Sequence, residues 1–211
     1  MSEHTEHTEQ ESQAGMKLLR LTPIQLDPGL TDQGMSLIQV LQKRKTIREF
    51  SDSKLSLETL SHLLWAACGI NRPDGAHRTA PSAKNAQEID IYVAMESGLY
   101  VFNPHAFTLV PILKDDIRTA TGWQDFVPQA PINLVYVADM AKMENGPRKE
   151  KKFYAALDTG FISQNVYLFC AAEGLATVVR GWVDRPALAQ VMKLGPEQRI
   201  IAAQSVGYPR V

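Results

Sequence analysis

Cysteine is scarce in this 211-residue chain, which contains only Cys68 and Cys170. Both lie in apolar stretches with helical spacing, so we interpret them as buried thiols. Two cysteines outside a CxxC spacing indicate neither a disulfide framework nor a cysteine-based metal site. The five histidines show no metal-ligand pattern, and we therefore expect no metal centre.

A basic start and a long apolar run are also missing. The first sixteen residues contain no Lys or Arg, and no apolar run approaches the roughly 18 residues that cross a bilayer. Because a signal peptide needs a basic and an apolar segment, we expect a cytoplasmic protein with no membrane partner. Residues 1–16 are polar and rich in glutamate, and we predict a disordered polar tail.

An excess of positive charge is absent as well. The chain has 22 Lys and Arg against 23 Asp and Glu, which gives a net charge of -1. Nucleic-acid-binding domains are usually clearly basic, so we expect no nucleic-acid partner. Hydrophobic residues at 45% and charged residues at 21% are typical of a globular protein. The length favours one domain, which we place at residues 35–211.

An arm precedes this domain. Residues 17–34 hold Pro23, Pro28, Gly29 and Gly34 among apolar residues. That composition is too apolar for a free linker, because apolar side chains favour burial. We therefore predict an extended N-terminal arm that lies on the domain.

Hydrophobic periodicity predicts helices at 36–45, 57–68, 149–173 and 185–193, with a short one at 115–121. Alternating apolar residues predict a strand that begins at residue 88. Further apolar runs predict strands at 99–102, 107–110, 132–138, 175–179 and 199–206. The segment 70–85 is predicted to be a loop. Strands flanked by long helices, with an early hairpin, indicate an α+β layered domain.

The long helix at 149–173 is apolar almost all round in its second half, which is typical of a buried helix. Asp158, Gln164 and Asn165 interrupt that apolar half, and buried polar side chains need hydrogen-bond partners. Those partners could belong to a ligand or to a neighbouring helix.

A basic segment follows the first predicted helix and contains Arg44, Lys45, Thr46 and Arg48. A phosphate group needs cations and hydroxyl donors within a small space, and these residue types can supply both. A solvated basic helix end, favoured by the helix dipole, explains the same residues without a ligand.

A polar segment, Pro81-Ser82-Ala83-Lys84-Asn85-Ala86-Gln87, precedes the strand that begins at residue 88. Ser82, Asn85 and Gln87 could point at one ligand. Their hydroxyl and amide groups suit the edge of a heterocycle that offers both donors and acceptors. Ordinary turn chemistry of Ser and Asn is the alternative.

Further candidates stand alone in the sequence. Glu173-Gly174 follows the long helix, where a glycine either lets the backbone approach a flat ring or simply ends the helix. Arg210 could close on a phosphate, or it could belong to a frayed terminus. Trp123 and Phe126 could form a wall on the substrate side or be core aromatics.

Together these segments resemble the FMN-dependent nitroreductase family over about residues 35–210. The resemblance rests on four features in chain order: Arg44-Lys45-Thr46-Ile47-Arg48, the loop Pro81 to Gln87, the long helix with Asp158, Gly160, Gln164 and Asn165, and Val206-Gly207-Tyr208-Pro209. The hairpin after Gln87 resembles the azoline-dehydrogenase-like branch more than the broad-substrate quinone and nitro reductases.

The resemblance implies a three-layer α/β/α domain with a central, mostly antiparallel sheet. It implies a homodimer built on the long helix, with two FMN sites at the interface. Arg44, Thr46 and Arg48 would bind the phosphate and ribityl side. The Pro81–Asn85 loop would reach the flavin from the partner subunit, and Glu173 and Gly174 would lie against the ring.

This sequence departs from the family pattern in three places. Lys45 stands where Arg or Ser is frequent, and Lys84 stands where Gly is frequent, so Lys84 could add a positive charge near the cofactor. Family members often continue past Gly-Tyr-Pro with further phosphate ligands, whereas this chain ends at Val211. Arg210 would then act alone there, and the N-terminal arm could replace the missing clasp.

The implied activity is hydride transfer from NADH or NADPH through flavin N5 to an electron-poor small molecule, such as a nitro compound or a quinone. No catalytic side chain is predicted, because the flavin carries the chemistry. Three alternatives stay open: a flavin-dependent dehydrogenase of a small substrate or peptide azoline, a non-catalytic FMN-binding protein, and nucleic-acid binding by the basic segment. No dinucleotide-binding motif distinguishes NADH from NADPH.

Overall fold

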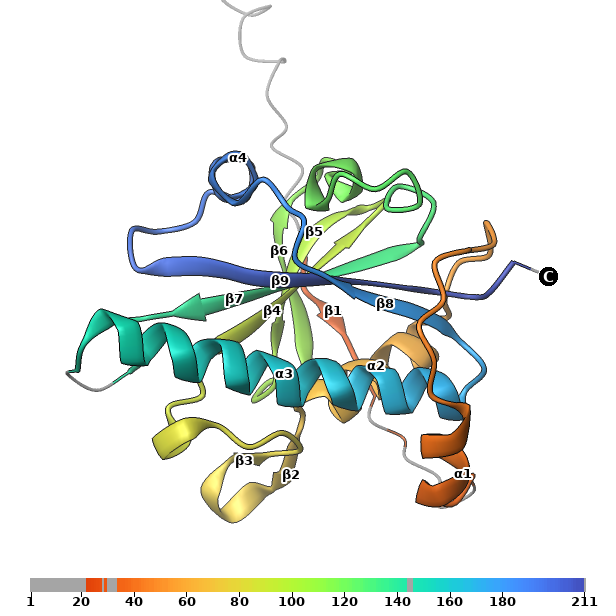
Figure 1. The fold of residues 1–211 in the computed structure, drawn as a ribbon, viewed down its shortest axis with the longest axis horizontal. Helices are drawn as coiled ribbons and strands as arrows, with labels where there is room; N and C mark the ends of the chain where they lie inside the picture. The colour runs from red at the N-terminus through yellow and green to blue at the C-terminus, as the bar shows by residue number, and fades with distance from the viewer. Residues whose placement is uncertain (1–21, 28, 30–33, 144–145, 211) are drawn as a thin grey trace, which may run out of the picture.

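The computed structural model describes residues 22–27, 29, 34–143 and 146–210 (Figure 1). Its centre is a seven-stranded sheet with the order β1-β6-β5-β4-β7-β9-β8, and every pairing in it is antiparallel. The strands are β1 (Ile24–Gln25), β4 (Ile89–Met95), β5 (Gly98–Asn103), β6 (Thr108–Leu113), β7 (Ile132–Asp139), β8 (Ala176–Arg180) and β9 (Gln198–Gly207).

Helices cover both faces of this sheet (Figure 1). They are α1 (Leu37–Lys43), α2 (Leu57–Cys68), α3 (Arg148–Ala172) and α4 (Arg185–Val191), with the short 3-10 turns η1 (Pro73–Gly75), η2 (Ala83–Asn85) and η3 (Arg118–Thr121). The first three helices lie on one face, and α4 and η3 lie on the other. The predicted α+β layered architecture is therefore confirmed.

Strand alternation divides the buried side chains into two cores. Ile89, Ile91 and Val93 of β4 pack with α2 and α3, whereas Tyr92 and Ala94 of the same strand pack toward α4. The central strand β7 is buried along both faces except at its last residue. This confirms the interpretation that its continuous apolar run belongs to a strand covered on both sides.

Helix α2 has the predicted bounds because its two ends carry strong local signals. The Ser56 side chain accepts a hydrogen bond from the Thr59 N–H at 3.0 Å, which caps the first turn. Gly69 ends the helix where a Cβ atom would come within 2.7 Å of the Trp65 carbonyl oxygen. A larger residue could not take that path without moving the backbone.

One side of α3 is not buried by this chain. Ala155, Ile162, Val166 and Cys170 face the sheet, as predicted, but Phe153, Leu157 and Phe161 are exposed at successive spacings of four residues. Burial was predicted for the second half of the helix, and there Phe161 is exposed in a single subunit because the sheet covers only one side of the helix. The first helix behaves similarly, with Val40 as its one buried residue among 37–43.

The arm and the predicted loop both contain short strands. In residues 22–27, the described part of the arm, β1 pairs with β6, and Leu26 is buried and donates its N–H to the Phe107 carbonyl at 3.1 Å. The predicted tail at 1–16 lies outside the described residues. The predicted loop at 70–85 contains the hairpin β2 (Ile70–Arg72) and β3 (His77–Arg78), and the predicted helix at 115–121 is only the 3-10 turn η3.

Candidate flavin site

The basic segment runs beside the sheet edge formed by β8. Helix α1 ends at Lys43, and Arg44 adopts a non-helical ψ of 117° that turns the chain away from the helix axis. The Ile47 N–H then donates to the Thr177 carbonyl of β8 at 3.1 Å. This bond fixes the segment against an edge strand, with Arg44 half-buried and Lys45, Thr46 and Arg48 exposed.

Tyr167 of α3 joins the basic segment to the same strand. Its hydroxyl lies 3.1 Å from the Thr46 hydroxyl and accepts the Val179 N–H at 3.0 Å. The Arg44 guanidinium carbon lies 5.6 Å from the centroid of the Tyr167 ring, within cation–π range. The sequence analysis missed this residue, because a tyrosine within an apolar helical run is usually a core aromatic.

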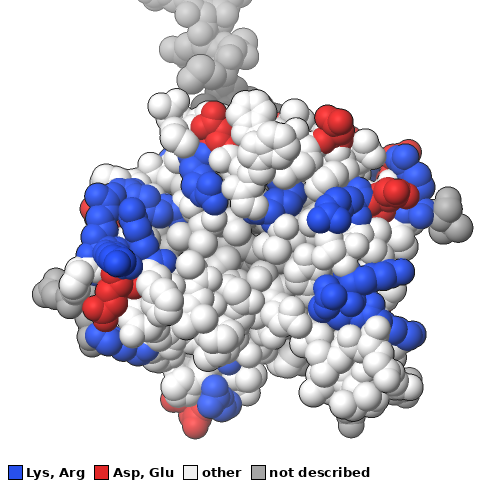
Figure 2. Space-filling view, in the orientation of Figure 1, with Lys and Arg blue, Asp and Glu red and all other residues white. Residues whose placement is uncertain are grey.

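The end of the chain returns to the basic segment. Phe50 forms a β-bridge with Pro209, and the Arg210 N–H donates to the Glu49 carbonyl at 3.2 Å. The Arg210 guanidinium reaches Gln129 at 3.4 Å. The structure therefore brings Arg210 together with the segment that contains Arg44, Thr46 and Arg48. Figure 2 shows Lys and Arg side chains gathered next to α1 on this side of the molecule.

Gly174 lies on the α1 side of the molecule, beyond the end of α3. Its φ of +68° favours glycine, and the next residue, Leu175, donates its N–H to the Cys170 carbonyl at 2.8 Å. Gly174 borders a cavity of about 460 Å³ together with Lys43, Lys45 and Ile47. Glu173 is exposed at the helix end and donates its N–H to the Phe169 carbonyl.

A second open glycine, which the sequence analysis missed, follows β8. A Cβ atom on Gly181 would meet nothing within 4 Å. The next residue, Trp182, is 67% exposed, and its carbonyl accepts the N–H of Trp123, which is 60% exposed. Phe126, predicted beside Trp123, instead packs on buried Phe50 at a centroid distance of 6.1 Å. The two tryptophans, rather than Phe126, thus present an open aromatic surface.

The Pro81–Gln87 loop is held in a strained shape by internal bonds. Lys84, Asn85 and Gln87 all have φ between 49° and 55°. The Ser82 hydroxyl accepts the Gln87 N–H at 3.0 Å, and the Asp158 carboxylate of α3 accepts the Ala83 N–H at 2.8 Å. The hydrogen-bond partner predicted for the Asp158 side chain is therefore the backbone of this loop.

The loop and the basic segment contact different parts of α3. Asp158 holds the loop and Tyr167 holds the basic segment, so the two anchors are nine residues apart, or about 13 Å along a helix axis. Figure 1 shows the same separation, with the yellow loop that follows β3 below the N-terminal half of α3 and α1 near the C-terminal end of that helix. Within one subunit, these two predicted parts of the site do not come together.

A pair of buried carboxyl groups lies behind the loop. Glu88 is fully buried, and neither of its carboxyl oxygens meets a hydrogen-bond donor among the described residues. Burial first, and then the charge of nearby Asp158, raises the pKa of Glu88 to about 7.

Among the described residues, no group of three His, Cys, Asp or Glu side chains could hold a metal ion. Within the same part of the chain, no helix is long and apolar enough to cross a membrane. Burial raises the pKa of the Cys68 thiol to about 11 and raises that of Cys170 still further. Both thiols are therefore protonated at neutral pH. Cys170 is buried, as interpreted from the sequence, whereas Cys68 is only partly buried by its exposed surface.

The sequence of the chain matches a known protein family. The family model described as the nitroreductase family matches residues 41–208, which include the basic segment and the Pro81–Gln87 loop. The chain belongs to the nitroreductase family. A protein of Methanocaldococcus jannaschii that is named as a nitroreductase is 31% identical over 170 residues, covering 76% of this chain and 85% of the relative.

Solved structures of nitroreductases have the same fold. The crystal structure of a protein from Ralstonia eutropha JMP134, described as a nitroreductase, superposes with a TM-score of 0.86 at 41% identity and covers 90% of each chain. A structure from Desulfovibrio desulfuricans, also described as a nitroreductase and solved in complex with FMN, has a TM-score of 0.61 at 22% identity. That match covers 86% of this chain and 89% of the other.

Proposed function

We propose that this nitroreductase-family protein is a homodimeric, FMN-dependent reductase that takes hydride from NADH or NADPH and delivers it to an electron-poor small molecule. The observation that carries the proposal is the gathering of Arg44, Thr46, Arg48 and Arg210 along the edge of β8. Charge-assisted hydrogen bonds from guanidinium groups suit a phosphate. A relative with FMN bound supports the identity of the ligand.

The residues present fit FMN. Three guanidinium groups and a hydroxyl would hold its phosphate and ribityl chain, and Lys45 adds a further exposed cation. Gly174 and Gly181 both leave open space where a side chain would otherwise stand, so a flat ring could approach the backbone at either position. Trp123 and Trp182 would form the wall on the acceptor side.

When bound, FMN supplies the redox chemistry, accepting a hydride from the nicotinamide and passing it to the acceptor. The protein's contribution is to bind, orient and exclude water. Asp158 would fix the Pro81–Gln87 loop through the Ala83 N–H, and that loop would present Asn85 to the ring. Lys84 would add positive charge on the same loop.

The homodimer is supported by apolar surface that a single subunit leaves uncovered. Phe153, Leu157 and Phe161 form a stripe on α3, and Leu37, Ile38 and Leu41 are exposed on α1. Figure 2 shows an uncharged area in the middle of the face that carries α3. A second subunit on this face would bury the stripe and could bring its own loop to the basic segment, which one subunit cannot do.

A charge placed in the stripe tests the dimer. Leu157→Glu should convert the protein to a monomer, because burying an unpaired carboxylate in an interface costs several kcal/mol. The mass in solution is measured by light scattering after gel filtration. Val191→Glu is the matched control, since Val191 is similarly exposed but lies on α4, on the opposite face of the sheet. A Leu157→Glu variant that stays dimeric would remove α3 from the interface.

The absorption spectrum of the purified protein tests the function. Flavin bands should be present, or appear after soaking with FMN, and should bleach on anaerobic addition of NADH or NADPH. Arg44→Ala should weaken FMN binding by roughly 10- to 100-fold, the loss expected for a hydrogen bond to a charged group. Arg72→Ala, an exposed arginine on the β2–β3 hairpin, should leave FMN affinity unchanged.

The same experiment separates the alternatives. Bound FMN that NADH and NADPH leave oxidised would point to a dehydrogenase of another substrate, including the peptide-azoline type, or to a non-catalytic FMN-binding protein. No FMN binding at all would contradict the assignment of the basic segment. The acceptor and a cytoplasmic location stay predictions.

A further inference from the structure

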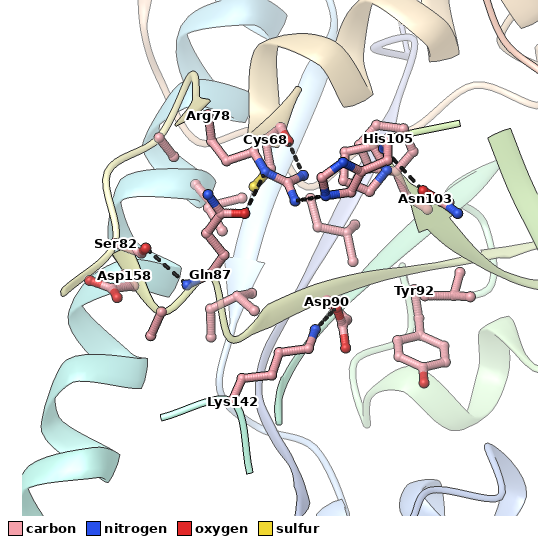
Figure 3. A pocket seen from close by; sticks show the side chains of 18 of the residues that line it. Cys68, Arg78, Ser82, Gln87, Asp90, Tyr92, Asn103, His105, Lys142 and Asp158 are labelled. Carbon is pink, nitrogen blue, oxygen red and sulfur yellow. Dashed lines mark hydrogen bonds and ion pairs between the residues drawn. The ribbon is translucent and has the colours of Figure 1, made fainter. Parts of the chain in front are cut away.

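A cavity of about 530 Å³ lies next to the Pro81–Gln87 loop (Figure 3). Residues of this loop, of the β2–β3 hairpin and of strands β4 and β5 form its walls. Among the described residues, Pro81, Ser82 and Gln87 of the loop line it, whereas none of Arg44, Thr46, Arg48, Gly174, Gly181 and Arg210 does. It is therefore distinct from the proposed phosphate site, and its volume lies in the range of small-molecule pockets.

The guanidinium group of Arg78 borders this cavity and has no carboxylate partner among the described residues. Its Nε donates to the Gln87 side chain at 3.0 Å, its Nη1 donates to the Cys68 carbonyl at 3.3 Å, and its Nη2 lies 3.3 Å from Nε2 of His105. A guanidinium has five N–H groups, so these three contacts leave two donors available. Figure 3 shows Arg78 and His105 meeting at one end of the cavity.

The acidic groups nearby cannot serve as the missing counter-ion. Asp90 forms an ion pair with Lys142 at 2.6 Å, so its charge is already compensated. Asp158 also lines the cavity, but one of its carboxylate oxygens accepts the Ala83 N–H, and no hydrogen bond or ion pair joins it to Arg78 among the described residues. The Cys68 thiol stays protonated, because burial raises its pKa to about 11. Burial lowers the pKa of Arg78, which is the effect expected of a cation that lacks a partner.

The rest of the lining is mixed: Asp90, Lys142 and Asp158 border the cavity, and apolar side chains form the wall beside them. Ile89, Ile91, Phe102 and Ile162 line it, and all four are nearly buried. A ligand that matches both parts needs one negative group for Arg78 and an uncharged, apolar body. A planar carboxylate can accept two parallel hydrogen bonds from one guanidinium group, which suits the two free donors of Arg78.

We propose that this cavity is a second ligand site, which binds a small organic carboxylate with its carboxylate on Arg78 and its apolar body against Ile91 and Phe102. The site shares no residue with the proposed phosphate site, but Pro81, Ser82 and Gln87 in its lining belong to the loop that the proposed function places beside the flavin. Occupancy would be sensed by the loop, since Gln87 contacts Arg78 through Oε1 and the Asn85 side chain through Nε2 at 3.1 Å.

Binding of 4-fluorobenzoate to the FMN-loaded protein, followed by ¹⁹F NMR, tests the proposal. The carboxylate should show saturable binding, and neutral 4-fluorobenzamide, which has the same shape, should bind at least about tenfold more weakly. This comparison uses the unaltered protein, so it does not depend on the folding of a variant. Absence of saturable 4-fluorobenzoate binding, or equal binding of the amide, would overturn the proposal.

Variants then locate the bound anion. Arg78→Gln should weaken 4-fluorobenzoate binding about tenfold or more, and Arg78→Lys should retain part of it. Arg72→Gln is the control from the same hairpin, because Arg72 contacts Asn71 and does not line the cavity. Binding that survives Arg78→Gln but is lost in Arg44→Gln would place the anion at the phosphate site, overturning this inference while leaving the proposed function intact.

Discussion

Arg180 and Glu88 are two of the ionisable side chains that are buried without an ion-pair partner among the described residues, and their surroundings differ. Arg180, at the end of β8, is 4% exposed, and Glu88, directly before β4, is 0% exposed. Arg180 is surrounded by fixed acceptors: its Nη1 donates to the Thr121 carbonyl at 2.7 Å and its Nη2 to the Asn133 side chain at 2.9 Å. Glu88 has no such donors around its carboxyl oxygens.

Burial shifts both pKa values toward the neutral form by similar amounts. It lowers the pKa of Arg180 from 12.5 to about 10, so the guanidinium stays charged at neutral pH. Burial, with Asp158 nearby, raises the pKa of Glu88 from 4.5 to about 7, which lies close to neutral pH. The charge state therefore depends on the ordinary pKa of each group, and the acceptors around Arg180 satisfy the charge that it keeps.

Removing the acceptor of Arg180 should have the largest effect. In Asn133→Leu, the guanidinium loses its side-chain acceptor inside the core, and we expect the free energy of unfolding to fall by about 3–5 kcal/mol. Urea titration measures the change. Ser205→Ala is the control, because the Ser205 hydroxyl donates to the same Asn133 oxygen, and its loss should cost only about 1 kcal/mol. Equal losses in the two variants would show that Asn133 does not hold the charge.

Replacing Glu88 should flatten the dependence of stability on pH. With a pKa of about 7 in the folded state and 4.5 as its ordinary value, Glu88 stays protonated on folding where the unfolded chain has lost the proton. Stability therefore falls as pH rises from about 4.5 to about 7, by at most about 3 kcal/mol, and is level above that range. Glu88→Gln should abolish this decline, measured by urea titration across the range.

An exposed carboxylate provides the comparison for Glu88. Glu197→Gln removes a solvent-exposed glutamate that lies before β9, and the decline between about pH 4.5 and 7 should remain. If the decline also persists in Glu88→Gln, another group is responsible for it. That result would remove the contrast with Arg180, because Glu88 would then carry its charge in the folded state.

Local signals explain why most of the fold could be predicted from the sequence. The Ser56 cap and the close packing at Gly69 set the bounds of α2, and the alternation of Ile89, Ile91 and Val93 marked β4. The hairpin of β2 and β3 was missed because strands of two or three residues are too short to show alternation.

The candidate site was harder to predict, because its parts meet only through long-range contacts. The polar segments were identifiable one by one, but the Tyr167 link between Thr46 and Val179 joins residues more than a hundred positions apart. Likewise, an apolar pattern around α3 cannot tell which side faces the sheet and which carries exposed Phe153 and Leu157. Gly181 was missed because an isolated glycine after a strand resembles an ordinary turn.

The Tyr167 hydroxyl extends the comparison of Arg180 and Glu88 to a polar group that is neither charged nor fully buried. Its removal should change the free energy of unfolding less than the changes at Asn133 and Glu88. Tyr167→Phe deletes the hydroxyl that accepts the Val179 N–H and meets Thr46, so we expect a loss of about 0.5–1.5 kcal/mol in the free energy of unfolding. FMN affinity should fall by only a few fold, because Arg44 can still lie over the ring.

Tyr154→Phe on the same helix is the control, since its hydroxyl makes no hydrogen bond to a described residue. If both variants lose the same stability and FMN affinity, the hydroxyl does not hold the basic segment against β8, and the bond from Ile47 to Thr177 does so alone.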